Sequence, residues 1–266
     1  MASATVAPQP VLPAALKSEW TKMRSVPSTM WALVAAVGIT VGLGSLLCLA
    51  YTARYERLAL RERLTADPTL LSLRGLFLSS LAMGVLGVLL ITAEYATGMI
   101  RATLTAVPQR GVVLAAKAIV FGGVAVVVSF GSAFAAFGAG QAILHRKNLG
   151  VSLSDPTVLR AVLGAGAYLT IIGLLGLALG TILRRTAGAI ATLVALVFIA
   201  DVLVQALPSP WNTDVGKFLP GNAGLALFTV HPNSDRLTPG SGFVVLLVWL
   251  AVAFIAASIS ITRRDA

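Results

Sequence analysis

Few residues in this sequence combine the types and spacing that chemistry requires. Its two histidines, His145 and His231, lie in separate predicted loops and form no H-E-x-x-H or other paired metal-ligand motif. The single cysteine, Cys48, lies in an apolar run, which excludes an intrachain disulfide and a cysteine-based metal site. A phosphate-binding loop reads G-x-x-x-x-G-K-[ST], whereas the only Gly-Lys pair, Gly216-Lys217, precedes a phenylalanine. The sequence therefore predicts no enzyme, and no metal or cofactor bound by this chain.

One acidic side chain, Asp201, stands within an apolar run, LVFIADVLVQ. Ionisable groups inside a membrane are costly and often functional. Asp201 nevertheless lies only six residues before Leu207, near a predicted interface where water reaches it. No Lys, Arg or His stands within the apolar runs to complete a proton relay. We therefore treat Asp201 as a candidate intramembrane acid and favour a structural role over proton coupling.

The composition indicates a membrane protein. The 266 residues are 57% hydrophobic and 11% charged, with a mean hydropathy of +0.90, whereas a soluble domain carries about 25% charged residues. The net charge of +10 comes from Lys and Arg in the short gaps between apolar runs. Basic residues in such gaps face lipid headgroups and set orientation. This distribution argues for a membrane partner and against a nucleic-acid partner.

Six apolar segments are long enough to cross a bilayer, which takes about 20 residues of helix. They cover residues 30–51, 75–93, 118–144, 161–183, 187–207 and 242–261. The alternating pattern of a membrane β-barrel is absent from the sequence. We expect an all-α membrane protein with six transmembrane helices, in which residues 1–15 form a flexible tail and residues 16–266 a single transmembrane domain.

The segment before the first apolar run, ALKSEWTKMRSVPSTMW, has an amphipathic pattern. Leu16, Trp20 and Met23 recur at i, i+4 and i+7. The charged residues take the other faces: Lys17, Glu19, Lys22 and Arg24. This pattern predicts a short helix lying in the membrane interface and ending near Pro27. An ordinary basic flank is the alternative.

The connector EYATGMIRATLTAVPQRGVVLAAK, residues 94–117, joins the second and third runs and is unusually structured. Gly98 and Pro108 bracket a helical stretch that presents Met99, Leu104 and Val107. A short, partly apolar helix flanked by arginines suits docking into a groove of another protein. A solvated loop is the alternative.

The connector also carries four charged residues: Glu94, Arg101, Arg110 and Lys117. We expect Glu94 to pair with Arg101 or Arg110, or to cap a helix end. The orientation of the connector is less strongly specified, because the twenty Lys and Arg residues divide equally between the two sides. Adjacent arginines at the span ends, in LRRTAG and ITRRDA, favour a cytoplasmic location for both termini and for the connector.

Two further patterns concern packing. The segment KFLPGNAGLALFTV, in the long loop of residues 208–241, is too apolar for a solvated loop and predicts a short helix that dips back towards the membrane. Gly173, Gly176 and Gly180 line one side of the fourth run, and such small residues permit close helix contact. We expect most of these glycines to serve packing within the chain.

Three segments resemble the permease subunits of the ABC-2 type family of ABC transporters, particularly those of actinobacterial type. SEWTKMRSVPSTMWAL, residues 18–33, is similar to the amphipathic entry and first span of that family. FLPGNAGLALF, residues 218–228, is similar to the segment before the family's last helix. The connector resembles a family pattern matched here by Glu94, Gly98, Arg101, Pro108, Arg110 and Lys117.

The resemblance implies a six-span permease subunit in the cell membrane, paired with an identical or different permease subunit around a translocation route. Two separate ATPase subunits would bind ATP and Mg²⁺ and drive export of a lipid-like, drug or peptide substrate. The connector would serve as the coupling helix to the ATPase, with Leu104 among its contacts, and the N-terminal interfacial helix would also touch the ATPase.

Two other functions remain open on the residues alone. A secondary transporter driven by an ion gradient would need intramembrane polar sites and usually internal repeats; Asp201 is one such site, and we find no repeat. A non-transporting scaffold or immunity-type membrane protein would also have spans and docking loops. A neighbouring gene encoding an ATPase would favour the permease over both.

Overall fold

The computed structural model describes residues 11–209, 211–230 and 236–263, which are helical throughout with short connections and contain no strand. Six helical segments are long and apolar enough to cross a membrane: Pro27–Arg57, Pro68–Ala96, Arg110–Lys147, Pro156–Leu183, Thr186–Gln205 and Pro239–Arg263. All six predicted spans are confirmed as helices, and the chain is an all-α, multi-pass membrane protein. The third span begins at Arg110, so Lys117 lies inside it rather than before it.

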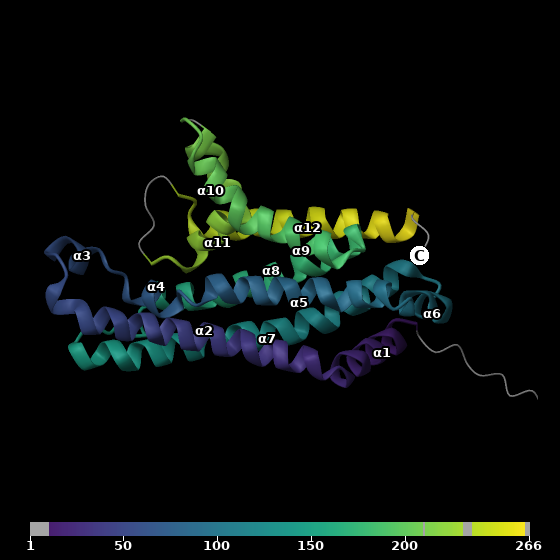
Figure 1. Ribbon diagram of the computed structural model, residues 1–266, viewed down its shortest axis with the longest axis horizontal. Helices are drawn as coiled ribbons and strands as arrows, with labels where there is room; N and C mark the ends of the chain where they lie inside the picture. The colour runs from purple at the N-terminus through teal and green to yellow at the C-terminus, as the bar shows by residue number, and fades with distance from the viewer. Residues whose placement is uncertain (1–10, 210, 231–235, 264–266) are drawn as a thin grey trace, which may run out of the picture.

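The six spans are built from the longer helices of Figure 1. The first is α2 (Pro27–Arg54) with the turn η1 (Tyr55–Arg57), and the second combines α4 (Pro68–Leu73) with α5 (Leu76–Ala96). The third is α7 (Arg110–Leu144) with η2 (His145–Lys147), and the fourth is α8 (Pro156–Leu183). The fifth runs from α9 (Thr186–Val194) through a π-helical turn (Ala195–Ile199) into α10 (Ala200–Gln205). The sixth is α12 (Pro239–Arg263).

Shorter helices connect or precede the spans. They are α1 (Val11–Ser25), α3 (Leu60–Thr65), α6 (Met99–Ala106), the turns η4 (Trp211–Val215) and η5 (Gly216–Phe218), and α11 (Pro220–Phe228). Because α1 begins at Val11, residues 11–15 are helical, and the tail predicted for residues 1–15 is corrected there. His231 and the arginine at position 264 lie outside the described residues.

Local sequence explains where several helices begin. Proline occupies the first turn of α2, α4, α8 and α11, where its missing N–H has no intrahelical partner to lose. Asp67 caps α4 by accepting hydrogen bonds from the backbone N–H groups of Thr69 and Leu70, at 2.9 and 3.1 Å. Asp155 caps α8 in the same way, accepting from the N–H of Thr157 at 2.8 Å.

Helix α8 forms the centre of the bundle. Within its apolar window 72% is buried, against 17% for the span α9–α10, whose second half, α10, projects from the bundle in Figure 1. Glycines let α8 and α5 touch: a Cβ on Gly176 would overlap the backbone of Gly84, and one on Gly87 would overlap the backbone of Gly173. The expected packing role of these α8 glycines is therefore confirmed within the chain.

The apolar segment of the long loop forms α11, which is buried against α8 and α12. Phe228 is fully buried, and its ring centroid lies 5.7 Å from that of Tyr168 on α8. Arg160 of α8 donates to the carbonyl oxygens of Leu227 and Thr229, at 3.1 and 2.9 Å, and so binds the last carbonyls of α11. The short helix predicted here is confirmed, and its backbone is covered by protein.

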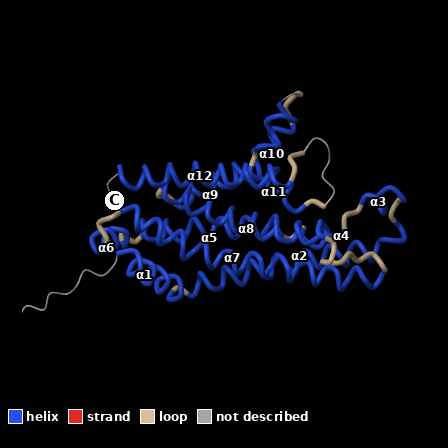
Figure 2. Tube along the Cα trace, turned by 180° about the vertical axis from the view of Figure 1, so that it is seen from behind, coloured by secondary structure: helices blue, strands red, loops and turns tan. Residues whose placement is uncertain are grey.

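The ends of the helices fall into two groups. In Figure 1 and from behind in Figure 2, α1, α6 and the C-terminal end of α12 lie at one end of the bundle, and α3 lies at the other. An even number of spans requires this arrangement. It brings the N-terminal helix and the connector of residues 94–117 together, although about seventy residues separate them in the chain.

Candidate functional site

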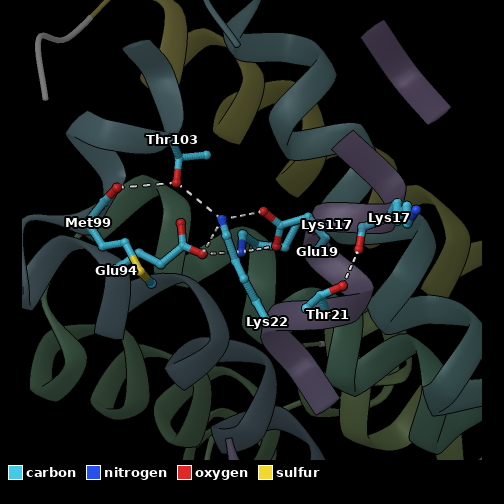
Figure 3. A network of polar contacts seen from close by, with 8 residues as sticks. All are labelled: Lys17, Glu19, Thr21, Lys22, Glu94, Met99, Thr103 and Lys117. Atoms are coloured by element: carbon cyan, nitrogen blue, oxygen red, sulfur yellow. Dashed lines mark hydrogen bonds and ion pairs between the residues drawn. The ribbon is translucent and has the colours of Figure 1, made fainter. Parts of the chain in front are cut away.

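Four charged side chains from three helices meet at the end of the bundle that holds α1 and α6 (Figure 3). Helix α1 contributes Glu19 and Lys22, α5 contributes Glu94, and α7 contributes Lys117. Lys117 Nζ lies 2.5 Å from Glu19 Oε2 and 2.8 Å from Glu94 Oε1. Lys22 Nζ lies 2.7 Å from Glu19 Oε1 and 3.1 Å from Glu94 Oε1. These four residues, named the charged cluster below, form a closed network in which each lysine binds both carboxylates.

The charged cluster is shielded from solvent. Glu19, Glu94 and Lys117 expose only 6, 3 and 4% of their surface, and the Lys22 side chain exposes 25%. Opposite charges at hydrogen-bond distance offset the desolvation of buried ions. Burial by itself lowers the pKa of Lys22, but the hydrogen bonds and charges of Glu19 and Glu94 outweigh it, so the pKa of Lys22 is raised. With two lysines and two glutamates, the cluster carries no net charge.

Helix geometry explains how these side chains converge. On α1, Ala15, Glu19 and Met23 form a buried stripe at a spacing of four residues, which is one face of an α-helix. Glu94 lies in the last turn of α5, and Lys117 lies about two turns inside α7, which has 35 residues. At about 1.5 Å per residue α7 is about 52 Å long, well beyond the hydrocarbon thickness of about 30 Å. Its first turns can therefore reach past the bilayer core.

The short helix α6 is attached to the charged cluster by a hydrogen bond and to the neighbouring helices by a buried apolar side chain. Lys22 Nζ donates to Thr103 Oγ1 at 3.1 Å, and Thr103 Oγ1 donates to the Met99 carbonyl at 3.2 Å. Ile100 is 2% exposed and belongs to the same buried apolar cluster as Met23 and Leu86. The opposite side of α6 remains accessible for contact, since Arg101 and Thr105 are exposed.

The connector residues predicted from the sequence lie on α6 or at its ends. Gly98 precedes it with φ +71°, a left-handed conformation that glycine adopts without strain, and turns the chain out of α5. Arg101 is exposed on α6 and Leu104 is half-buried. Pro108 is exposed just beyond the end of the helix. The predicted helix between Gly98 and Pro108 is therefore present.

The expected partner of Glu94 was wrong. Among the described residues Glu94 pairs with Lys22 and Lys117, not with Arg101 or Arg110. The Arg110 guanidinium instead donates to the carbonyl oxygen of Ile261, at 3.1 Å, near the end of α12. Arginine suits this position because its fixed charge lies at the negative end of a helix dipole.

The short helix predicted before the first span is present as α1, but the expected position of Glu19 on it was wrong. Trp20 is 51% exposed, Leu16 is half-buried, and Met23 is 6% exposed against protein. Glu19, expected on a polar face, points into the bundle with Met23. Charge pairing with Lys117 makes that burial possible.

Asp201 lies on α10, where it faces α11. Its Oδ1 accepts a hydrogen bond from Asn222 Nδ2 at 3.3 Å, and a Cβ on Gly221 would overlap Oδ2. Asn222 also donates to the Gly216 carbonyl, at 3.0 Å. These contacts join α10 to the beginning of α11 and give Asp201 a packing role.

Glu19 and Lys22 were missed as site residues by the sequence analysis, and Lys117 was noted only as one of the charges of the connector. A usable signal was present: Glu19 shares the four-residue spacing of Ala15 and Met23, and Lys117 precedes an apolar run without a break. Their convergence with Glu94 still required the tertiary structure, because the residues come from three distant helices.

The fold and site define a multi-pass, all-helical membrane protein with a buried ion network at one end of its bundle. The described residues contain no group of three or more His, Cys, Asp or Glu side chains arranged to hold a metal ion. No protein-family model matches the chain, and comparison with curated protein sequences gives no match.

Proposed function

We propose that the chain is the membrane-spanning permease subunit of an ATP-driven exporter of the ABC-2 type, working with a second permease subunit and with separate ATPase subunits. The observation that carries this proposal is the charged cluster, because it fastens α1 and α6 to the ends of the spanning helices α5 and α7. A contact made by α6 therefore reaches two transmembrane helices directly.

The connection between α6 and the spans is short. Helix α6 has eight residues and is joined to α5 through Gly98 and to α7 through Pro108. Lys22 binds Thr103 on α6 and Glu94 on α5 with the same ammonium group. A displacement of α6 therefore moves the ends of α1 and α5 instead of being absorbed by a loop.

The outer face of α6 supplies the docking surface for the ATPase. Arg101 and Thr105, one turn apart on α6, are both exposed, which offers a fixed positive charge and a hydroxyl for contact. Trp20 on the neighbouring α1 is 51% exposed and provides either an interfacial anchor or a further contact. In this arrangement ATP and Mg²⁺ bind to the ATPase, and this chain supplies the route for a lipid-like, drug or peptide substrate.

Co-purification tests the proposal. The tagged full chain is extracted gently from its native membrane, its partners are identified by mass spectrometry, and ATPase activity is measured in the eluate. We expect a stoichiometric nucleotide-binding subunit with the wild type and its loss with Arg101→Glu. Arg61→Glu is the matched control, because Arg61 is an exposed arginine on α3 at the opposite end of the bundle.

Two results would count against the proposal. A homo-oligomer without ATPase activity would exclude the permease role and direct attention to an ion gradient and Asp201, or to a scaffold. Failure of Arg101→Glu to insert into the membrane would show that Arg101 acts in folding and not in docking.

A further inference from the structure

A pocket of about 260 Å³ lies directly beside the charged cluster, between α1, the beginning of α2, α5 and α7. The four cluster residues line one end of it. Its other walls are mainly apolar and include Met23, Leu86, Leu89, Leu90, Val120 and Phe121. Along α5 the lining extends from Glu94 back to Leu86, eight positions earlier, which is about 12 Å at about 1.5 Å per residue. The pocket is therefore polar at one end and apolar along its length.

One of the four carboxylate oxygens at the polar end of the pocket has no hydrogen-bond partner. Both carboxylate oxygens of Glu19 and the Oε1 atom of Glu94 accept from lysine. Glu94 Oε2 is buried and has no hydrogen-bond partner among the described residues, although Glu94 is only 3% exposed. In Figure 3 one oxygen of the Glu94 carboxylate stands apart from the dashed contacts. A buried acceptor without a partner is costly, so a ligand that donates to it gains that energy back.

The charges of the cluster decide which donor fits. An anionic headgroup is disfavoured because the three N–H donors of Lys22 are already directed at Glu19, Glu94 and Thr103. Two of the three N–H donors of Lys117 are likewise directed at Glu19 and Glu94. A cationic headgroup would add charge to a neutral cluster and would lie close to the ammonium groups of Lys22 and Lys117, which both contact Glu94. A hydroxyl donates one hydrogen bond and adds no charge.

We propose that this pocket binds an uncharged amphiphile with a hydroxyl at its polar end, such as a fatty alcohol or a monoacylglycerol. The hydroxyl donates to Glu94 Oε2, as a charge-assisted hydrogen bond, and the hydrocarbon chain lies along α5 towards Leu86. The bound molecule contacts α1, α5 and α7 at the point where the charged cluster joins them.

The mouth of the pocket matches lateral entry from the membrane. Val26 and Leu89 line the pocket and are 45 and 40% exposed, so its rim is apolar on the side of α5, while the exposed Ser28 makes part of it polar. Leu89 belongs to the second transmembrane span. An amphiphile dissolved in the bilayer can therefore reach the pocket with its chain still in an apolar environment. This inference goes beyond the proposed permease role and does not depend on it.

Photolabelling of the purified full chain in lipid nanodiscs tests the site. The probe is a decanol that carries a diazirine on its chain, and labelled peptides are located by mass spectrometry. We expect saturable labelling of residues on α5 and α7 that line the pocket. Unlabelled decanol should compete at least about tenfold better than decyl methyl ether, which keeps the chain but cannot donate to a buried carboxylate.

Head-group and mutant controls sharpen the result. Decanoate and decylamine should both compete less well than decanol, because the cluster favours an uncharged donor. Leu89→Trp should narrow the mouth and reduce labelling about tenfold, a factor that corresponds to about 1.4 kcal/mol. Leu78→Trp is the matched control, since Leu78 lies on the same helix, is 49% exposed and does not line the pocket.

Several outcomes would overturn the inference. Equal competition by decyl methyl ether would show that Glu94 Oε2 is satisfied in another way, for example by water. Stronger competition by decanoate or decylamine would assign the site to a charged ligand. Equal loss of labelling with Leu78→Trp, or unsaturable labelling, would indicate non-specific partition into the bilayer. None of these outcomes bears on ATPase docking, because the ATPase is absent from the assay.

Discussion

Replacing Lys117 by methionine removes one of the two ammonium groups in the charged cluster while keeping a side chain of similar length. The remaining Lys22 would then face both Glu19 and Glu94, and the buried cluster would carry a net negative charge. We expect a large loss of stability, because an uncompensated buried charge is far more costly than a missing contact.

The burial and distances of Lys117 determine how large the loss of stability should be. Lys117 Nζ lies 2.5 and 2.8 Å from the two carboxylates, and its side chain is 5% exposed. Removing one partner of such a buried pair costs about 3–5 kcal/mol. Lys147→Met is the matched control: Lys147 pairs with Glu56 at 3.1 Å, but the two side chains are 48 and 82% exposed. An exposed pair of this kind contributes about 0–1 kcal/mol.

Unfolding of the detergent-solubilised protein by sodium dodecyl sulfate, followed by tryptophan fluorescence, measures both variants. A second comparison separates charge from packing: adding Glu94→Gln to Lys117→Met restores neutrality and should recover about 1–3 kcal/mol relative to additive losses. A loss of stability with Lys117→Met no larger than that with Lys147→Met would contradict the prediction. Additive losses of unfolding free energy for Lys117→Met and Glu94→Gln would also contradict it.

Three further predictions concern other parts of the molecule. Arg101→Glu should leave the free energy of unfolding within about 0.5 kcal/mol of wild type, because Arg101 is exposed, and should act only on ATPase co-purification and transport. Gly176→Ala should destabilise by about 1–3 kcal/mol in the same unfolding assay, because its Cβ would overlap the backbone of Gly84; Gly123→Ala, which meets nothing within 4 Å, should not destabilise. The pKa of Lys22 is raised in the folded protein, so its stabilising contribution is fully present below the ordinary lysine pKa of 10.5. The contribution is lost as the pH rises through the higher pKa of the folded state. Raising the pH through this range should therefore destabilise the wild type more than Lys22→Met.

Hydropathy predicted the six spans because the requirement is local. A helix that crosses about 30 Å of hydrocarbon needs about 20 apolar residues in a row, and each span satisfies this without help from its neighbours. The connector helix was predicted for a similar reason. Gly98 and Pro108 mark its ends, and both residues act through their own backbone conformation.

Helix surfaces were predicted less well. Helical periodicity placed Leu16, Trp20 and Met23 on one apolar face, but α1 packs against α7 through the stripe that contains Glu19. In water, periodicity identifies the buried face because polar residues avoid burial. At the edge of a membrane, an apolar residue such as Trp20 is stable facing lipid, and a charged residue can be buried if it is paired.

The sequence by itself determined that this protein is an all-α membrane protein, where its six spans lie and that a short helix joins the second to the third, because chain length, hydropathy and glycine or proline act over a few neighbouring residues. Only the tertiary structure decided the partners of its charges. Glu19, Glu94 and Lys117 are separated by up to 98 positions. The Lys117 ammonium nevertheless lies within 2.8 Å of a carboxylate oxygen of each glutamate, because α1, α5 and α7 converge at one end of the bundle. Ion pairing depends on that convergence, and no local pattern encodes it.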